Sequence, residues 1–117
     1  MHERSLVNAL LCQVEALQRR EHADRVLTVH VSVGAFSGVE PDLFGSAFEE
    51  AVAASPLRGA DLRMQQVSLE ARCDACACEF LVERFRFRCP ACDSGRVTVL
   101  RGEELMLESV TMEQVES

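Results

Sequence analysis

The hydrophobic positions in the first half of the chain recur at two spacings, which predict a helix, a strand and a second helix. Residues 4–21 place an aliphatic side chain at every third or fourth position, the period of one buried helix face. Residues 25–33, RVLTVHVSV, alternate instead, as in a half-buried strand. Pro41 then opens a second aliphatic stretch, with Glu40 in the capping position, and SPLRG ends it. The residues expected on the buried face of the strand are Leu27, Val29, Val31 and Val33.

The second half of the chain predicts two further strands, separated by a cysteine-rich segment. Residues 60–71 are interpreted as one strand whose alternation slips at Gln65-Gln66, a sign of a bulge or of an exit from the sheet. Apolar residues between Leu105 and Met112 predict a third strand. Two strands are too little sheet to cover two helices, so we expect this third strand to return to the first domain.

These elements predict an α+β fold, with two helices packed on a small three-stranded sheet and an inserted cysteine-rich module. The first domain is expected to comprise residues 1–71 plus 97–117, and the inserted module residues 72–96. A length of 117 residues fits one small domain that carries a smaller module.

Charge and hydropathy exclude several classes of partner. The 12 basic and 19 acidic residues give a net charge of −7, which argues against binding to nucleic acid. No apolar run reaches the length of a bilayer span, so no membrane association is expected. The first residues lack the pattern of a signal peptide, and the expected compartment is the cytoplasm.

Five of the six cysteines fall between residues 73 and 92, in paired spacing that favours a metal site over disulfides in a reducing compartment. Two CxxC knuckles separated by twelve residues can bring four thiolates to a tetrahedron, the arrangement of a structural zinc ribbon. The intervening ERFRFR alternates arginine with phenylalanine and is expected to form a hairpin, whose arginines would offset the negative charge of the site. Two disulfides are the alternative. The expected zinc ligands are Cys73, Cys76, Cys89 and Cys92.

Two cysteines remain outside this set. Cys78 is interpreted as a spare thiol because only the CxxC spacing is repeated in the second knuckle, with ligand exchange as its functional alternative. Cys12 falls on the polar face of the first helix and is expected to be a surface thiol.

The opening residues Met1-His2-Glu3 form a candidate ligand set for a second metal. A free α-amine has a reference pKa of about 7.7–8.0, so it can release its proton to a metal near neutral pH. The amine, the deprotonated amide and imidazole Nδ1 of His2 would close adjacent five- and six-membered chelate rings. This flat array suits Ni²⁺ or Cu²⁺, and Glu3 can complete it through its amide or carboxylate. A chance histidine at position 2 is the alternative.

The joint pattern resembles the HypA/HybF family of nickel-insertion accessory proteins over essentially the full length. It comprises MHE at the start, a leucine-rich helix, the VSVG strand, GVEPDLF, FEE, the CxxC and CPxC knuckles, and GEEL. The resemblance implies a nickel site at Met1, His2 and Glu3, with Glu40 as a further candidate, and zinc at the four knuckle cysteines. Family members usually carry glycine after the second cysteine, where this chain has Ala77-Cys78.

The same resemblance implies a nickel metallochaperone, not an enzyme, that serves nickel-iron hydrogenase or urease maturation. The implied partners are a HypB-type GTPase, a hydrogenase large-subunit precursor and urease accessory proteins. A zinc-ribbon interaction adaptor without a nickel site is the main alternative. A thiol redox protein using Cys76 and Cys78 is a second, although no general base accompanies a nucleophile in the sequence.

Overall fold

The protein is elongated and consists of two modules joined by a narrow neck. A computed structural model describes residues 2–114, with side chains from Glu3 onward. Its principal extents are 61 × 31 × 16 Å, and its radius of gyration is 17.9 Å, whereas a compact domain of about 100 residues has about 13 Å. No helix of this described part is long and apolar enough to cross a membrane.

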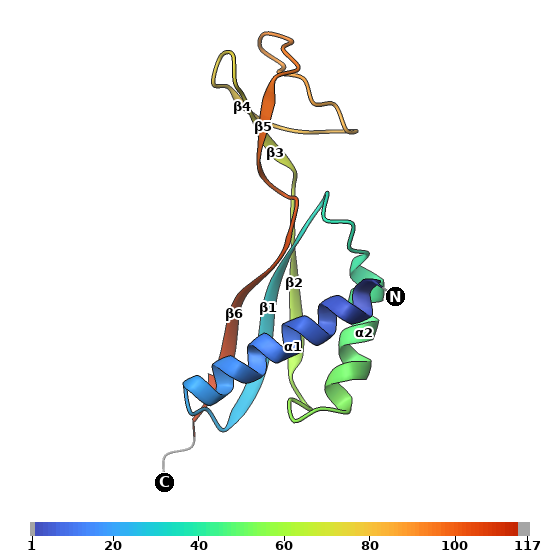
Figure 1. Cartoon of the computed structure of the whole chain (residues 1–117), viewed down its shortest axis with the longest axis vertical. Helices are drawn as coiled ribbons and strands as arrows, with labels where there is room; N and C mark the ends of the chain where they lie inside the picture. The colour runs from blue at the N-terminus through green and yellow to red at the C-terminus, as the bar shows by residue number, and fades with distance from the viewer. Residues whose placement is uncertain (1, 115–117) are drawn as a thin grey trace.

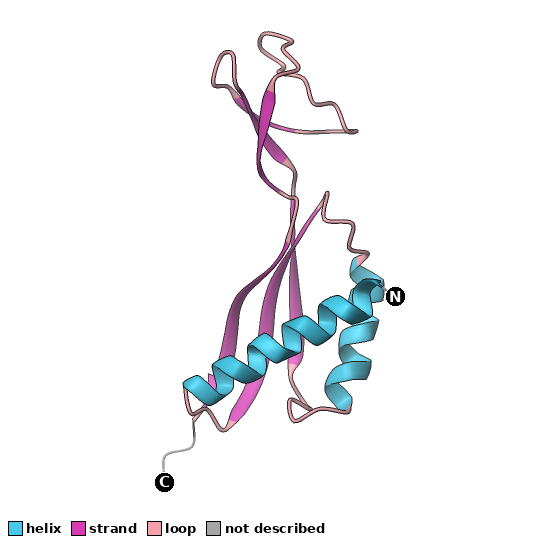
Figure 2. Cartoon of the chain, viewed as in Figure 1, coloured by secondary structure: helices cyan, strands magenta, loops and turns pink. Residues whose placement is uncertain are grey.

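The first module contains both helices and three of the strands, and the second module is built from short strands and loops (Figures 1 and 2). The elements of the first module are α1 (His2–Arg20), β1 (Arg25–Gly34), α2 (Pro41–Ala53), β2 (Asp61–Val67) and β6 (Leu105–Glu113). Those of the second are β3 (Glu70–Cys73), β4 (Glu79–Leu81) and β5 (Val97–Arg101).

The sheet of the first module has the order β2-β1-β6. Strands β1 and β2 are parallel, with Val29 opposite Leu62, because α2 provides the crossover between them. Strand β6 returns antiparallel to β1, with Val110 opposite Val29. The predictions of two helices on a three-stranded sheet and of a returning C-terminal strand are therefore confirmed.

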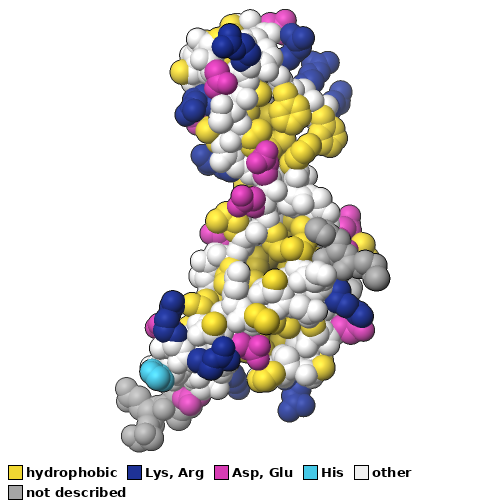
Figure 3. Space-filling view, in the orientation of Figure 1, with side chains coloured by type: hydrophobic (Ala, Val, Ile, Leu, Met, Phe, Trp, Pro, Cys, Tyr) yellow, Lys and Arg dark blue, Asp and Glu magenta, His cyan; other side chains and the backbone are white. Residues whose placement is uncertain are grey.

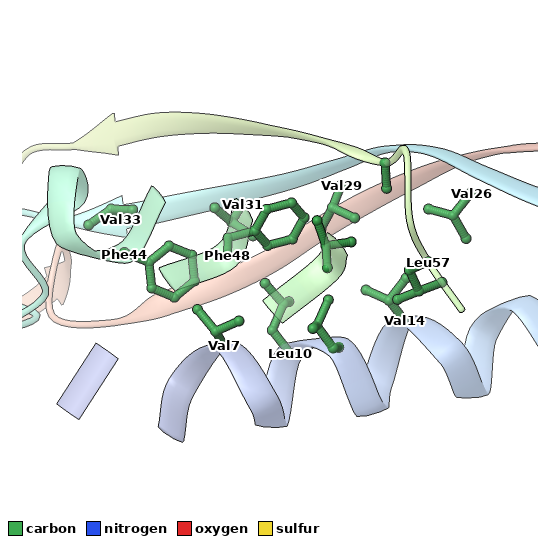
Figure 4. Packing of buried hydrophobic residues seen from close by; sticks show 13 residues of the cluster. Val7, Leu10, Val14, Val26, Val29, Val31, Val33, Phe44, Phe48 and Leu57 are labelled. Atoms are coloured by element: carbon green, nitrogen blue, oxygen red, sulfur yellow. The ribbon is translucent and has the colours of Figure 1, made fainter. Parts of the chain in front are cut away.

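The core lies between this sheet and the two helices, which cover the same face (Figure 4). Val7 and Val14 of α1 are fully buried, as are Phe44 of α2 and Val29 of β1. Figure 4 shows the aromatic rings of α2 between the valines of β1 and the aliphatic face of α1. The core therefore holds the middle of α1, from Val7 to Val14, against the sheet.

The predicted buried face of β1 is wrong at one position, Leu27. Val26 is buried and Leu27 is half-buried, because the pairing with β6 shifts between Val26 and Thr28. A bulge of this kind inserts one extra residue, here Leu27, and reverses the alternation on one side of it. Beyond the bulge Val29, Val31 and Val33 are buried as predicted.

The single strand predicted over residues 60–71 is in fact two strands in different sheets. β2 ends at Val67 and β3 begins at Glu70, so the slip in alternation marks an exit from the sheet. The exit lies at Ser68-Leu69, a few residues after Gln65-Gln66, because β1 still pairs with β2 as far as Val67.

The neck between the modules consists of Gly34 to Phe36, Val67 to Leu69 and Gly102 to Glu104. Backbone hydrogen bonds join its three segments: Gly34 N–H to the Glu104 carbonyl (3.0 Å), Ala35 N–H to Val67 (2.8 Å) and Phe36 N–H to Gly102 (2.8 Å). A Cβ atom at Gly34 would lie 2.3 Å from the Gly102 oxygen. The close approach of the two segments therefore requires glycine at position 34.

The second module is an antiparallel sheet of order β4-β3-β5. The predicted hairpin strand over ERFRFR is not formed, because Arg84 and Phe85 both have left-handed backbone angles (φ 53° and 59°) that turn the chain. The predicted division at residues 72 and 96 stays a prediction; β3 begins before the first boundary and β5 follows the second.

Candidate metal centres

Four cysteine sulfurs meet at the far end of the second module. Cys73 ends β3, Cys76 lies in the turn after it, and Cys89 and Cys92 lie in the loop before β5. All four Sγ atoms lie within 4.8 Å of one another, and the Cys73–Cys92 and Cys76–Cys89 pairs are 3.5 Å apart. A tetrahedron with Zn–S bonds of about 2.3 Å has edges of roughly 3.8 Å, so the cluster fits zinc.

The two knuckles have the same backbone geometry. In each, the first cysteine accepts a hydrogen bond from the N–H four residues later and donates one to the carbonyl five residues later. The bonds of Cys73 with Ala77 and Cys78 measure 2.9 and 2.8 Å, and those of Cys89 with Asp93 and Ser94 measure 2.8 and 2.9 Å. These backbone bonds close both turns in the same way, so the two knuckles present their cysteines with matching geometry.

The thiols differ in acidity because each knuckle directs N–H groups at its buried sulfur. The N–H of Cys76 contributes most to lowering the pKa of Cys73. Burial raises the pKa of Cys89, but hydrogen bonds from the N–H groups of Cys92 and Ala91 outweigh this effect and lower the pKa to about 6. The N–H of Cys78 lowers the pKa of Cys76, yet the neighbouring Cys89 sulfur and burial raise it to about 12. Each close pair therefore joins a cysteine of lowered pKa, Cys73 or Cys89, to one of raised pKa, Cys92 or Cys76.

Ala77 has a left-handed backbone (φ 65°), a conformation that costs a residue with a Cβ about 1 kcal/mol or more relative to glycine. Replacing Ala77 by glycine is therefore expected to raise the free energy of unfolding by about 0.5–1 kcal/mol, measured by denaturant titration of the metal-loaded protein. Ala75→Gly is the matched control, because Ala75 lies in the same knuckle without a positive φ and should lose stability. A destabilised Ala77→Gly variant would contradict this account.

The two remaining cysteines lie outside the cluster. Cys78 is half-buried, and its Sγ donates a hydrogen bond to the Glu79 carbonyl at 3.7 Å. Cys12 is exposed on α1. The four-membered cluster leaves both without a ligand position in this structure.

The predicted amino-terminal site is only partly described. Met1 and the side chain of His2 lie outside the described residues, but α1 begins at His2. The first N–H groups of a helix have no acceptor within that helix. Glu3 is half-buried and lines an open groove of about 320 Å³ between α1 and α2.

The groove beside Glu3 also contains an acidic residue that the sequence analysis missed. Glu50 lines it from α2 and forms an ion pair with Arg4 at 3.6 Å. Its position follows from the packing of α1 on α2, which no local motif reveals. Glu40 caps α2 with a 3.5 Å contact from the Asp42 N–H to Oε1, and it is not among the residues lining this groove. Its role as a nickel ligand stays a prediction.

A four-cysteine cluster on a small sheet, joined to a helix-covered domain, is the arrangement of a protein with a candidate metal site. The profile of the family described as "Hydrogenase/urease nickel incorporation, metallochaperone, hypA" matches residues 1–112. The chain therefore belongs to the HypA family.

Individual relatives agree with this assignment over nearly their whole length. The hydrogenase maturation factor HypA of Streptomyces avermitilis is 42% identical over 115 residues, which cover 97% of this chain and 88% of that protein. The HypA of Desulfitobacterium hafniense is 33% identical over 97% of this chain and 100% of that protein. The solution structure of the nickel metallochaperone HypA from Helicobacter pylori superimposes with a TM-score of 0.73 at 28% identity, covering 97% of this chain and 98% of that one.

Proposed function

We propose that the protein carries one Ni²⁺ at its amino terminus and delivers it to a nickel-iron hydrogenase precursor or to urease. The observation that supports this most is the full-length match to the HypA family in a chain that opens with Met1-His2-Glu3. The step is transfer of a bound cation: the amine and the amide lose protons to solvent when nickel binds and regain them when it leaves.

The proposed nickel ligands are the Met1 amine, the His2 amide and imidazole, and Glu3. Glu3, Glu50 and Arg4 line the groove beside α1, and because Arg4 pairs with Glu50, Glu3 is the carboxylate of this groove proposed to bind the cation. The amine, imidazole and carboxylate all compete with protons for the metal, so the affinity for nickel should fall as the pH falls. Ligands contributed by the first residues of α1 would pass the ion on to a partner's ligands.

The four-cysteine cluster is the proposed zinc site. Cys73, Cys76, Cys89 and Cys92 would supply four thiolates and leave zinc no open position, which is the pattern of a structural site. Bound zinc would hold the two knuckles together. The proposed task of the module is to present its surface to partners.

The proposed partners are those that the family implies. A HypB-type GTPase would supply nickel or assist its release, and the hydrogenase large-subunit precursor would receive it. Urease accessory proteins are the corresponding partners where urease is the recipient. The proposed compartment is the cytoplasm.

The proposal predicts that His2→Asn lowers the affinity for Ni²⁺ at least about tenfold, because it removes the imidazole from the chelate; a tenfold loss corresponds to about 1.4 kcal/mol. Isothermal titration calorimetry with nickel measures it. His22→Asn is the control, because His22 is exposed at the end of α1 and asparagine tolerates its left-handed backbone (φ 54°). Equal losses in both variants, or no loss in either, would reject the site and favour a zinc-ribbon adaptor.

A further inference from the structure

The loop from Glu83 to Arg88 concentrates positive charge in an otherwise acidic protein. Arg84, Arg86 and Arg88 fall within five residues of a chain whose net charge is −7. Arg88 is engaged by Asp93, at 3.1 Å from its carbonyl and 3.5 Å from its carboxylate. Within the described part of the chain, no carboxylate lies within ion-pair distance of Arg84 or Arg86. These two guanidinium groups are therefore available to an outside anion.

Apolar surface lies directly beside these arginines. The side chain of Phe85 is 72% exposed and that of Leu81 is 54% exposed. An open groove of about 440 Å³ lies next to the loop, large enough for an aliphatic or aromatic side chain. Figure 3 shows arginine and hydrophobic surface side by side on the second module. The residues that line the groove are Phe80, Leu81, Glu83, Arg86, Arg88, Cys89, Pro90 and Asp93.

The loop is held in place from two sides. Phe85 and Phe87 both pack edge-on against Phe36 from the neck, with ring centroids 5.6 and 6.0 Å away. The Arg86 N–H bonds to the Glu83 carbonyl at 3.0 Å and closes the turn. A surface fixed in this way loses little conformational entropy on binding, which is a property of docking sites.

We propose that this surface, formed by Arg84, Phe85, Arg86 and the adjoining groove, docks an acidic protein segment that carries an apolar side chain. The apolar side chain occupies the groove at Leu81, and flanking carboxylates bond to Arg84 and Arg86. Glu83 and Asp93 also line the groove, and the three arginines leave this surface a net charge of +1 against them, whereas charges farther away than about 8 Å are largely screened at physiological salt. A long polyanion or a charged membrane would also meet the acidic remainder of the molecule and be repelled. The surface is separate from the proposed nickel site, so its failure would leave the nickel proposal intact.

The test uses the full-length, metal-loaded protein and a fluorescein-labelled twelve-residue peptide, Glu-Glu-Leu repeated four times. Anisotropy should show saturable binding that weakens as salt is raised. Arg84→Ser with Arg86→Ser should raise Kd about tenfold, the effect expected for loss of two exposed charge pairs. Arg58→Ser with Arg63→Ser is the control, because it makes the same change in net charge on exposed residues of the first module. Leu81→Ser should weaken binding of the Glu-Leu peptide but not of a Glu-Ser peptide, because Leu81 lines the groove and is exposed.

Two further measurements make the outcome decisive. In the wild-type protein, amide chemical shifts of residues 80–88 should move on adding peptide, whereas those of α1 should not. Heparin and phosphatidylserine vesicles should bind more weakly than the peptide. The proposal is overturned if the peptide does not bind, if the double variant and its control lose affinity equally, or if either heparin or the vesicles bind more tightly.

Discussion

Gly102→Ala is expected to lower the free energy of unfolding by about 3 kcal/mol or more, in the upper range for a point substitution. Gly102 has φ 102°, and a Cβ atom there would lie 2.6 Å from both Leu69 Cα and the Ser68 carbonyl oxygen. These neighbours are backbone atoms of the neck and cannot rotate away. Either the segments separate, which breaks the Phe36 N–H bond to Gly102, or the variant unfolds. Thermal and denaturant unfolding measure the loss.

Two other glycines separate the backbone clash from the cost of the dihedral angle. Gly59 has nearly the same φ, 97°, but an added Cβ would meet no atom within 4 Å. Gly59→Ala should therefore cost only the conformational strain, about 1–2 kcal/mol. Gly95 has neither a positive φ nor a near neighbour, so Gly95→Ala should be close to neutral. Equal losses in the free energy of unfolding for Gly102→Ala and Gly59→Ala would contradict the close backbone approach at Gly102.

Removing the metal from the four-cysteine site is expected to unfold the second module and leave the first folded. Among the described residues outside the main core, the buried apolar ones are only Leu69, Ala71 and the cluster cysteines Cys73 and Cys89. So small a core cannot offset the entropy of ordering three short strands, whereas zinc binding to small cysteine-rich modules contributes about 10–16 kcal/mol. Amide hydrogen exchange with and without a chelator should show lost protection for residues 70–101 and retained protection in α1 and β1.

Single substitutions test whether the loss of amide protection arises at the four-cysteine site. Cys89→Ser should reproduce the result of the chelator, because serine keeps the shape of the side chain but loses the thiolate. Cys12→Ser should have no effect, because Cys12 is exposed on α1 and far from the cluster in sequence. Full protection of residues 70–101 after metal removal would show that the sheet of the second module is stable by itself.

Local patterns predicted the elements of the first module well. The buried face of α1 and the returning strand β6 follow from periodicity, which local sequence carries. The bulge at Leu27 does not, because it depends on the register against β6, far along the chain. The second sheet was missed because its strands have only 3 to 5 residues, too few for a period of two to stand out.

The candidate sites divide in the same way. The knuckle cysteines could be predicted because each CxxC turn fixes two ligands locally and the repeat pairs them. The conformation of the ERFRFR segment could not be predicted. Its alternation is typical of a strand, but it contacts Phe36 of the neck, and two residues with left-handed backbone angles make it a turn. Glu50 reaches the groove beside Glu3 only through the packing of α1 on α2.

A nickel titration by calorimetry on protein whose first residue is Met1, compared with protein carrying one additional residue before it, tests the proposed function most directly. The added residue converts the α-amine into an amide and leaves His2, Glu3 and the rest of the chain unchanged. The account predicts that the first protein binds one Ni²⁺ and that the extended protein binds it far more weakly or not at all. Equal binding by both would contradict the account, because the amine would then be no ligand.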